Sequence, residues 1–206
     1  MISWNRIRYT VWAPVYDALA GAARFEGARR RSIDGLRLVA GDRLLIAGAG
    51  TGLDLDYLPA TVSVTAVDVT KAMLVRLERR AARLGLTVRT HVMDARLLAF
   101  PDGAFDAVIL HLVLAVMPDP EQGLREVERV LRPGGRVAIF DKFLRDADSA
   151  PMARRLLNLV ARPTFTDLNR KLGPLLRGTR FVLERDEPAA FKGWYRIATL
   201  RKPGNM

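Results

Sequence analysis

A glycine-rich turn directly after a short apolar run is the feature that most constrains the fold of this chain. Residues 43–47 are too few for a buried helix and typical of a buried parallel strand, and Gly48, Gly50 and Gly52 follow at alternate positions. Glycines let the backbone turn tightly and approach a ligand closely. A second apolar run ends about 20 residues later in Asp68, where a carboxylate can bind the two hydroxyls of a ribose. We therefore expect an adenosine-containing molecule across the carboxyl ends of two neighbouring strands.

The spacing of the glycines distinguishes between adenosine ligands. Dinucleotide sites use Gly-x-Gly-x-x-Gly, whereas Leu53 stands at the last of these positions here. No tyrosine has a lysine four residues later, as short-chain dehydrogenases need, and the Gly-Lys-Ser/Thr of a Walker loop does not occur. The remaining candidate is S-adenosylmethionine, which carries an amino acid where a dinucleotide carries phosphate. A tight turn that binds nothing is the alternative interpretation.

The core of the chain alternates apolar runs with helical patterns, which predicts right-handed crossovers and a mostly parallel sheet covered on both faces. The expected strands lie near residues 43–48, 62–67, 87–92, 105–110 and 136–142. The expected helices lie near 53–59, 71–84 and 119–131. Residues 179–187 and 192–201 are typical of two further strands, which we expect to close the sheet as an antiparallel hairpin.

These segments, together with the glycine turn, resemble the class I S-adenosylmethionine-dependent methyltransferases over about residues 40–145. The segments that carry the resemblance are His-Val-Met-Asp-Ala at 91–95, the run at 105–111, and the helix, Pro-Gly-Gly turn and strand at 124–140. The resemblance implies a Rossmann-like α/β fold with a mostly parallel seven-stranded sheet and helices on both faces. It also implies S-adenosylmethionine as cofactor and S-adenosylhomocysteine as product.

The resemblance further implies where the cofactor lies. The glycine turn surrounds the methionine part, Asp68 binds the ribose, and Asp94 with its neighbours binds the adenine. The expected cofactor residues are Tyr16, Gly48, Ala49, Gly50, Thr51, Gly52, Asp68, Val69, Met73, Met93, Asp94, Ala95 and His111. For Asp94, a solvated carboxylate at a strand end is the alternative.

Length and composition limit the class of protein. At 206 residues the chain suits one domain, with N-terminal amphipathic helices at 1–38, a cofactor core at 40–145, and a helical insert with C-terminal strands at 146–206. There is no cysteine and there are two histidines, so disulfides and thiolate or multi-histidine metal sites are excluded and no metal is expected. The start lacks the apolar region of a signal peptide, and no apolar run approaches the ~20 residues that span a bilayer. We expect a cytoplasmic protein.

The net charge of +11 is concentrated outside the core. Residues 44–150 hold thirteen basic and fourteen acidic residues, whereas residues 151–206 hold twelve basic and four acidic ones. Aromatic and aliphatic residues alternate with arginines near the N-terminus, and residues 152–162 have the pattern of a basic amphipathic helix. Such segments are typical of helices in a membrane interface, with packing on the same domain as the alternative for the N-terminus. We expect both segments to cover the substrate pocket.

Three motifs narrow the resemblance to one branch of the family. Trp-Ala-Pro-Val-Tyr-Asp at 12–17, the glycine turn and Leu-Arg-Pro-Gly-Gly at 131–135 resemble the ubiquinone/menaquinone-biosynthesis methyltransferases and a group of bacterial phosphatidylethanolamine N-methyltransferases. In these the Tyr-Asp segment folds over the cofactor. Phe-Asp-Lys-Phe at 140–143 resembles the phospholipid enzymes, which implies N-methylation of phosphatidylethanolamine toward phosphatidylcholine at the inner face of the cell membrane.

Other acceptors stay open at this point. The alternatives are a quinone-type C-methyltransferase or another small-molecule methyltransferase. A nucleic-acid methyltransferase is disfavoured because the chain has no Asn-Pro-Pro-Tyr motif for base flipping. We expect an anionic membrane surface and a phospholipid as partners, no nucleic acid, and no obligate protein partner.

Methylation of an amine requires its neutral form, so a proton acceptor is expected near the substrate. Asp141 and His111, at the mouths of neighbouring strands, are the expected acceptors. Tyr16 and Tyr195 are expected to contact methylated ammonium groups by cation–π interaction, and Lys142 and Arg180 to hold the lipid phosphate. The alternatives are that His111 only lines the methionine site and that Tyr195 packs within the sheet.

Overall fold

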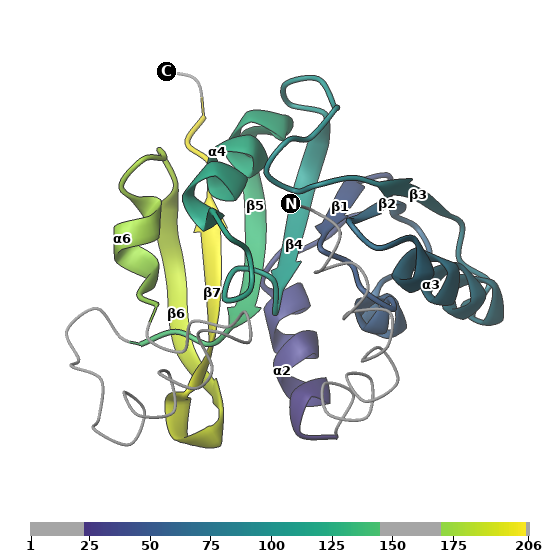
Figure 1. The fold of residues 1–206 in the computed structure, drawn as a ribbon, viewed down its shortest axis with the longest axis horizontal. Coiled ribbons are helices and arrows are strands. Elements are labelled where there is room, and N and C mark those ends of the chain that lie inside the picture. Colours follow the sequence, from purple (N-terminus) through teal and green to yellow (C-terminus); the bar gives the residue numbers. More distant parts are fainter. Residues whose placement is uncertain (1–22, 145–169, 205–206) are drawn as a thin grey trace.

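The computed structural model describes residues 23–144 and 170–204 of the chain (Figure 1). The expected N-terminal helix up to residue 22, Tyr16 and the expected basic helix at 152–162 lie outside the described residues. Within them, seven strands form one sheet in the order β3-β2-β1-β4-β5-β7-β6. The strands are β1 (Arg43–Ala47), β2 (Ser63–Asp68), β3 (Val88–Val92), β4 (Phe105–His111), β5 (Leu131–Asp141), β6 (Val182–Ala190) and β7 (Tyr195–Arg201).

The pairing of these strands confirms the predicted class I methyltransferase fold. Strands β1 to β5 pair in parallel, and β7 runs antiparallel to both β5 and β6. The predicted hairpin is therefore present, and each of its strands begins three residues later than expected. Strand β5 begins five residues earlier than expected, because Leu131 pairs with Phe105 and a bulge precedes the next pair, Arg136 with Ala107.

Helices cover both faces of the sheet (Figure 1). They are α2 (Ala23–Asp34), the 3₁₀ helix η1 (Leu53–Tyr57), α3 (Lys71–Leu84), α4 (Pro120–Val130), α6 (Leu172–Leu176) and the 3₁₀ turn η3 (Phe191–Gly193). Leu44 and Ile46 of β1 belong to the core shared with α2 and α3, whereas Leu45 and Ala47 belong to the core shared with α4 and α6. Alternate residues of one strand thus pack on opposite layers, which is why its sequence is apolar without alternation.

The direction of the strands determines where a ligand can bind. The carboxyl ends of β1 to β5 meet at one edge of the sheet, where ligands bind in open parallel α/β folds. The described part of the chain contains no helix with the length and apolar character required to cross a bilayer.

Candidate functional site

A cavity of about 300 Å³ lies at the carboxyl ends of β1, β2 and β4 and beside the loop after β3. This volume is at the lower end of the range for small-molecule sites. Eleven of the expected cofactor residues line it, namely Gly48, Ala49, Gly50, Thr51, Asp68, Val69, Met73, Met93, Asp94, Ala95 and His111. Gly52 is not among the lining residues, and Tyr16 lies outside the described residues.

The three glycines of the turn are needed for different reasons. All have positive φ angles, of 77° at Gly48, 53° at Gly50 and 82° at Gly52, which side chains rarely adopt. A Cβ atom on Gly52 would lie 2.8 Å from Leu77, so this glycine allows close packing of the turn on α3 rather than contact with the cavity. A Cβ atom on Gly50 would meet nothing within 4 Å, so this lining position keeps an open face toward a ligand.

Asp68 joins the end of β2 to the glycine turn. Its carboxylate accepts hydrogen bonds from the backbone N–H groups of Gly50 (2.9 Å) and Thr70 (2.8 Å). Burial raises the pKa of Asp68, although these two hydrogen bonds oppose the shift. The carboxylate therefore holds the turn in shape while it lines the cavity, and its contact with a ribose stays a prediction.

Asp94 also lines the cavity, and it lies in the loop after β3. Arg96 donates to both of its carboxylate oxygens, from Nε at 3.1 Å and from Nη2 at 2.7 Å, and this pairing lowers the pKa of Asp94. The carboxylate is thus paired rather than simply solvated. An adenine amine at this position would share Asp94 with Arg96.

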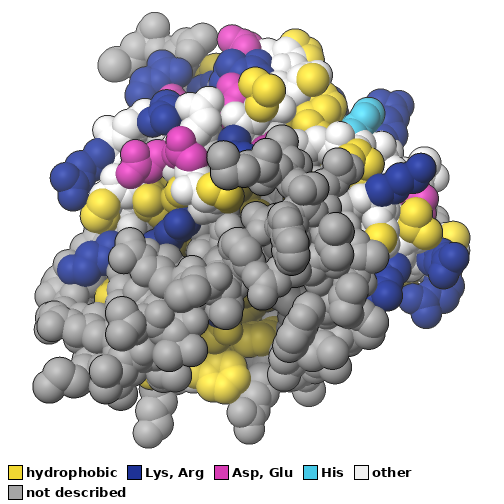
Figure 2. Space-filling model, in the orientation of Figure 1, with side chains coloured by type: hydrophobic (Ala, Val, Ile, Leu, Met, Phe, Trp, Pro, Cys, Tyr) yellow, Lys and Arg dark blue, Asp and Glu magenta, His cyan; other side chains and the backbone are white. Residues whose placement is uncertain are grey.

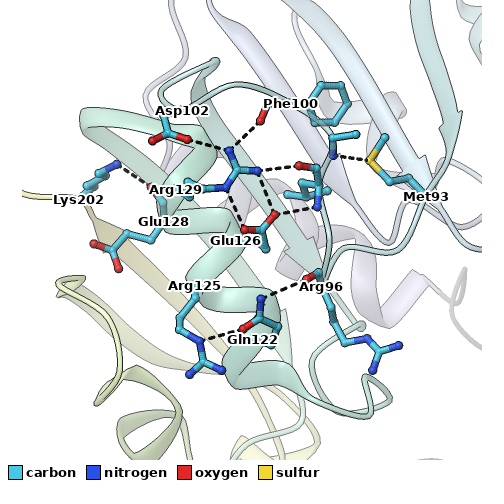
Figure 3. A network of polar contacts seen from close by, with 12 residues as sticks. Met93, Arg96, Phe100, Asp102, Gln122, Arg125, Glu126, Glu128, Arg129 and Lys202 are labelled. Atoms are coloured by element: carbon cyan, nitrogen blue, oxygen red, sulfur yellow. Dashed lines mark hydrogen bonds and ion pairs between the residues drawn. The ribbon is translucent and has the colours of Figure 1, made fainter.

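The loop that carries Asp94 is held in place by α4 (Figure 3). The guanidinium of Arg129 donates to the carbonyl oxygens of Leu98 (2.6 Å) and Phe100 (2.8 Å), and Glu126 accepts from the backbone N–H of Leu98 at 2.8 Å. Arg129 also donates to Glu126 at 2.9 Å, which keeps both side chains in position. Sequence reasoning missed this pair, because its partners are loop carbonyl groups that have no residue-type signal.

A buried polar network was also missed, and it forms the wall nearest β4. Arg29 and Ser32 come from α2, Asp54 from η1 and His111 from the end of β4. Asp54 accepts from the Arg29 guanidinium and contacts His111 Nδ1 at 2.7 Å, while His111 Nε2 lies 2.9 Å from the Ser32 hydroxyl. Burial alone would raise the pKa of Asp54, but attraction to Arg29 and His111 outweighs it and lowers the pKa well below its ordinary value.

This network leaves His111 without a free ring nitrogen. An ionised carboxylate can only accept, so Nδ1 donates its proton to Asp54. The second nitrogen, Nε2, is within hydrogen-bond distance of Ser32, and the side chain is 1% exposed. His111 lines the cavity, as both interpretations of the sequence expected, and both of its ring nitrogens have hydrogen-bond partners within the protein.

The Asp141 side chain lies away from the cavity wall. This side chain is fully buried and does not line the cavity, and its carboxylate accepts from the backbone N–H groups of Ala115 (3.0 Å) and Lys142 (2.7 Å). Burial raises the pKa of Asp141, although these hydrogen bonds oppose the shift. The carboxylate anchors the loop after β4, which carries the lining residues Val113 and Val116, instead of facing a substrate amine as expected.

Asp141→Asn is expected to become more stable relative to the wild type as the pH rises. A carboxyl group with a raised folded pKa is stabilising at low pH, and this contribution is lost as the pH rises from about 4 through the folded pKa. Asparagine does not titrate, so the difference between the two unfolding free energies reports this group alone. Urea unfolding of both proteins from pH 4.5 to 8 measures it. A wild-type advantage that grows with pH would contradict the assignment.

The three expected substrate residues separate into two places. Lys142 Nζ lies 5.8 Å from the ring centroid of Tyr195, beside the carboxyl end of β5 and hence at the cavity edge of the sheet. Arg180 lies toward the other edge, because the hairpin places the start of β6 beside Arg201, which pairs with Arg136 and not with the carboxyl end of β5. It donates to Glu128 at 2.8 Å and lines a separate hollow with Lys202. The structure therefore places Arg180 away from the cavity, and its expected role in substrate binding stays a prediction.

The charges of the cavity wall suit a cationic ligand. The wall has one more negative than positive charge. It carries the carboxylates of Asp54, Asp68 and Asp94 and the guanidiniums of Arg29 and Arg96. S-adenosylmethionine carries a sulfonium, an ammonium and a carboxylate and is a net monocation. The open face at Gly50 and this charge balance both fit that molecule.

Comparison with known proteins agrees with this geometry. A family model described as a methyltransferase domain matches residues 45–139. A phosphatidylethanolamine N-methyltransferase from Cereibacter sphaeroides is 39% identical over 140 residues, which cover 67% of this chain and 68% of the relative. A demethylmenaquinone methyltransferase from Thermus thermophilus is 36% identical over 173 residues, which cover 81% of this chain and 75% of the relative.

Solved structures share the fold as well. The crystal structure of the cyclase SpnF superposes with a TM-score of 0.78 over 97% of this chain and 95% of that one, at 22% sequence identity. At this identity the similarity speaks for the fold and not for the reaction. The two sequence relatives are both named for methyl transfer, and they differ in the acceptor.

Proposed function

Because this chain belongs to the class I S-adenosylmethionine-dependent methyltransferases, we propose that it methylates the amine of phosphatidylethanolamine at a membrane surface. The observation that carries the proposal is the 39% identity to a relative named for that reaction. Two features of the structure support it. They are the position of exposed aromatic side chains beside the cavity edge and the distribution of positive charge.

The cofactor cavity supplies the first half of the reaction. When bound, S-adenosylmethionine provides a methyl group activated by its sulfonium. The glycine turn and Asp68 are proposed to hold the methionine and ribose parts, so that the methyl group is presented to the acceptor. Methyl transfer forms a carbon–nitrogen bond as the carbon–sulfur bond breaks, and positioning of the two reactants contributes most of the acceleration.

The acceptor amine must lose a proton before it attacks, since a primary ammonium has a pKa of ~10, judged by lysine. Asp141 is sealed from the cavity and His111 has both nitrogens engaged, so we propose neither as the base. The roles proposed for the chain's described residues are therefore binding and orientation. Tyr16 keeps its expected place over the cofactor as part of the proposal.

An aromatic surface at the cavity edge suits an approach to lipid. Phe191 and Trp194, in and beside η3, are 48% and 36% exposed, and Tyr195 with Lys142 lies next to them. Aromatic residues with a cation nearby are typical of protein surfaces at a membrane interface. Figure 2 also shows Lys and Arg side chains gathered at the right-hand edge, over α3, which carries Arg76, Arg79, Arg80 and Arg83.

The direct test uses the purified full chain with S-adenosylmethionine carrying a deuterated methyl group. Vesicles of phosphatidylethanolamine and phosphatidylglycerol are offered, and labelled mono-, di- and trimethylated lipid is measured by mass spectrometry. We expect labelled phosphatidylethanolamine products, and less product at high salt because surface attraction is screened. A parallel reaction offers a polyprenylated naphthoquinol, since the second relative is named for menaquinone methylation. Labelled quinone with unlabelled phospholipid would overturn the proposal.

Replacing both Phe191 and Trp194 by serine is expected to lower the initial rate on vesicles at least about tenfold, because each aromatic ring loses apolar contact with the membrane. Affinity for S-adenosylhomocysteine, measured by calorimetry, is expected to stay unchanged. Val39→Ser is the matched control, since Val39 is 62% exposed and precedes β1 at the opposite edge of the sheet. Equal rates for the double variant and the control would speak against this surface.

A further inference from the structure

We propose that the separate hollow at the amino edge of the sheet, where the parallel strands begin, binds the phosphate group of a soluble phosphate monoester. This hollow has a volume of about 460 Å³ and lies among α4, the turn before β4, the start of β5 and the residues next to β6 and β7. Its charged lining residues are Arg125, Arg129, Arg180, Lys202, Asp102 and Glu128. Because it lies at the edge opposite to the cofactor cavity, the proposal does not depend on the methyl acceptor.

Two of the four cations of the hollow are paired with carboxylates. Arg129 pairs with Asp102 at 2.8 Å and with Glu126 at 2.9 Å, so it supplies no excess positive charge. Arg180 pairs with Glu128 at 2.8 Å through its Nε, and its side chain is 72% exposed. The Nη groups of Arg180 donate to no other residue in the described part of the chain. They are therefore accessible to a ligand in the hollow.

The other two cations have no carboxylate partner among the residues that the structure describes. Arg125 is exposed on α4, and its Nε donates to the neutral side chain of Gln122 at 3.0 Å. Lys202 is 7% exposed, and its Nζ donates to the carbonyl oxygens of Glu128 (2.6 Å) and Leu131 (2.7 Å). Burial lowers the pKa of Lys202, since these neutral acceptors replace water without supplying a negative charge. Lysine is rarely buried without a counter-charge, so an anion nearby would be favourable.

Three of the cations converge around Glu128. Its carbonyl oxygen binds Lys202, its carboxylate binds Arg180, and Arg125 lies three residues earlier on the same face of α4. Figure 3 shows Lys202, Glu128 and Arg125 on the same side of this helix. A Cβ atom on Gly178 would lie 3.4 Å from Nη1 of Arg125, so the Arg125 guanidinium lies beside the segment that carries Arg180. One carboxylate thus serves three cations, which leaves two excess positive charges at this point.

A phosphate monoester matches this arrangement in charge and in hydrogen bonding. It carries a charge of about −2 at neutral pH and has three acceptor oxygens, which guanidinium groups bind with paired N–H donors. The surrounding edge also attracts anions, because two of its carboxylates are each shared by two arginines, namely Asp106 by Arg43 and Arg132, and Glu184 by Arg136 and Arg201. The cofactor cavity, in contrast, has one more negative than positive charge.

The position of the hollow favours a soluble ligand over a lipid. Strand β4 has seven residues, so roughly 20 Å separate its two ends. If the cavity edge rests on a membrane, the amino edge faces away from it. A lipid phosphate has the same chemistry, and the experiment therefore includes an arm for each source.

The first arm is an NMR titration of the ¹⁵N-labelled full chain with glycerol 3-phosphate at constant ionic strength. We expect saturable shifts of the amide signals of Gly103 and Lys202, which line the hollow, and no shift at Gly50 of the cofactor cavity. Arg125→Gln is expected to weaken this affinity about 5- to 10-fold, because a charge-assisted contact to phosphate is lost. The substitution leaves no carboxylate unpaired, since the partner of Arg125 is Gln122.

Arg132→Gln is the matched control, because it removes the same charge from the same edge but from a side chain that pairs with Asp106 and does not line the hollow. We expect it to change the affinity by less than about twofold, since its charge is screened by solvent. Equal weakening in both variants would indicate diffuse attraction to the edge and would overturn the proposal. Shifts that do not saturate would overturn it too, and would leave Lys202 only the capping of α4.

The second arm measures co-sedimentation with phosphatidylcholine vesicles that contain phosphatidic acid, whose headgroup is a phosphate monoester. For a soluble ligand we expect Arg125→Gln and Arg132→Gln to sediment equally. Selective loss of vesicle binding in Arg125→Gln, without saturable binding of glycerol 3-phosphate, would assign the hollow to a lipid and overturn the soluble ligand. Neither arm contains S-adenosylmethionine, so no outcome bears on the identity of the methyl acceptor.

Discussion

Asp54→Asn is expected to lower the free energy of unfolding by about 3–5 kcal/mol, the range for a buried ion pair that loses one partner. Asp54 is 4% exposed and is shared by Arg29 and His111. Removing its charge leaves the Arg29 guanidinium buried without a counter-charge. Urea unfolding followed by circular dichroism measures the loss.

The pH dependence of this loss has a defined sign. The folded pKa of Asp54 lies below its ordinary value, so its contribution is present above about pH 4 and is lost as the pH falls toward the folded pKa. The gap between the wild type and Asp54→Asn should therefore shrink as the pH falls below about 4. The buried carboxylates of Asp68 and Asp141 are present in both proteins and cancel in this difference.

A nearby aspartate provides the control for Asp54. Asp56 lies in the same 3₁₀ helix and pairs with Arg80 at 2.5 Å, but the two side chains are 36% and 23% exposed. Exposed pairs contribute about 0–1 kcal/mol, so Asp56→Asn is expected to change stability little. If both variants lost the same stability, the burial of the Arg29–Asp54 pair would not be the cause.

Gly48→Ala is expected to destabilise the protein by about 2–4 kcal/mol and to weaken S-adenosylhomocysteine binding more than about tenfold. The φ angle of 77° strains any side chain at this position. In addition, the new Cβ would lie 2.4 Å from Val113 Cγ2, so the loop after β4 must move. Gly48 and Val113 both line the cavity, and their displacement changes its shape. Thermal unfolding and calorimetric titration measure the two effects.

Two further variants distinguish backbone strain from steric clash. Gly85 ends α3 with a φ angle of 67° and would meet nothing within 4 Å, so Gly85→Ala is expected to cost about 1–2 kcal/mol of strain and leave ligand affinity unchanged. In Gly48→Ala/Val113→Ala the smaller neighbour makes room, and we expect part of the lost affinity to return. Failure of this second substitution to restore any affinity would contradict the steric explanation.

Much of the fold follows from local pattern. The four strands from β1 to β4 lie within about a residue or two of their expected positions, because short apolar runs bounded by turns identify buried parallel strands. Strand β5 was mispredicted at its start, since Pro133 and the two following glycines suggested a turn, while the structure accommodates them in a bulge of the strand. Pairing with β4 decided that boundary, and a partner strand is not visible in a local window.

For the candidate site, too, some features follow from the local sequence and others from the tertiary structure. By itself, the sequence determined which residues follow the end of each strand. Parallel pairing brings those residues to one edge of the sheet. Asp68, Asp94 and the glycine turn were therefore expected at one cavity, and the structure places them there. Only the tertiary structure decided what Asp141 and His111 contact, because burial and hydrogen-bond partners depend on segments far away in the chain. The network of Arg29, Ser32, Asp54 and His111 joins three segments from 29 to 111, and no spacing rule connects them. Local sequence carries strand position and turn chemistry, whereas the partner of a buried charge is set by the packing of whole elements.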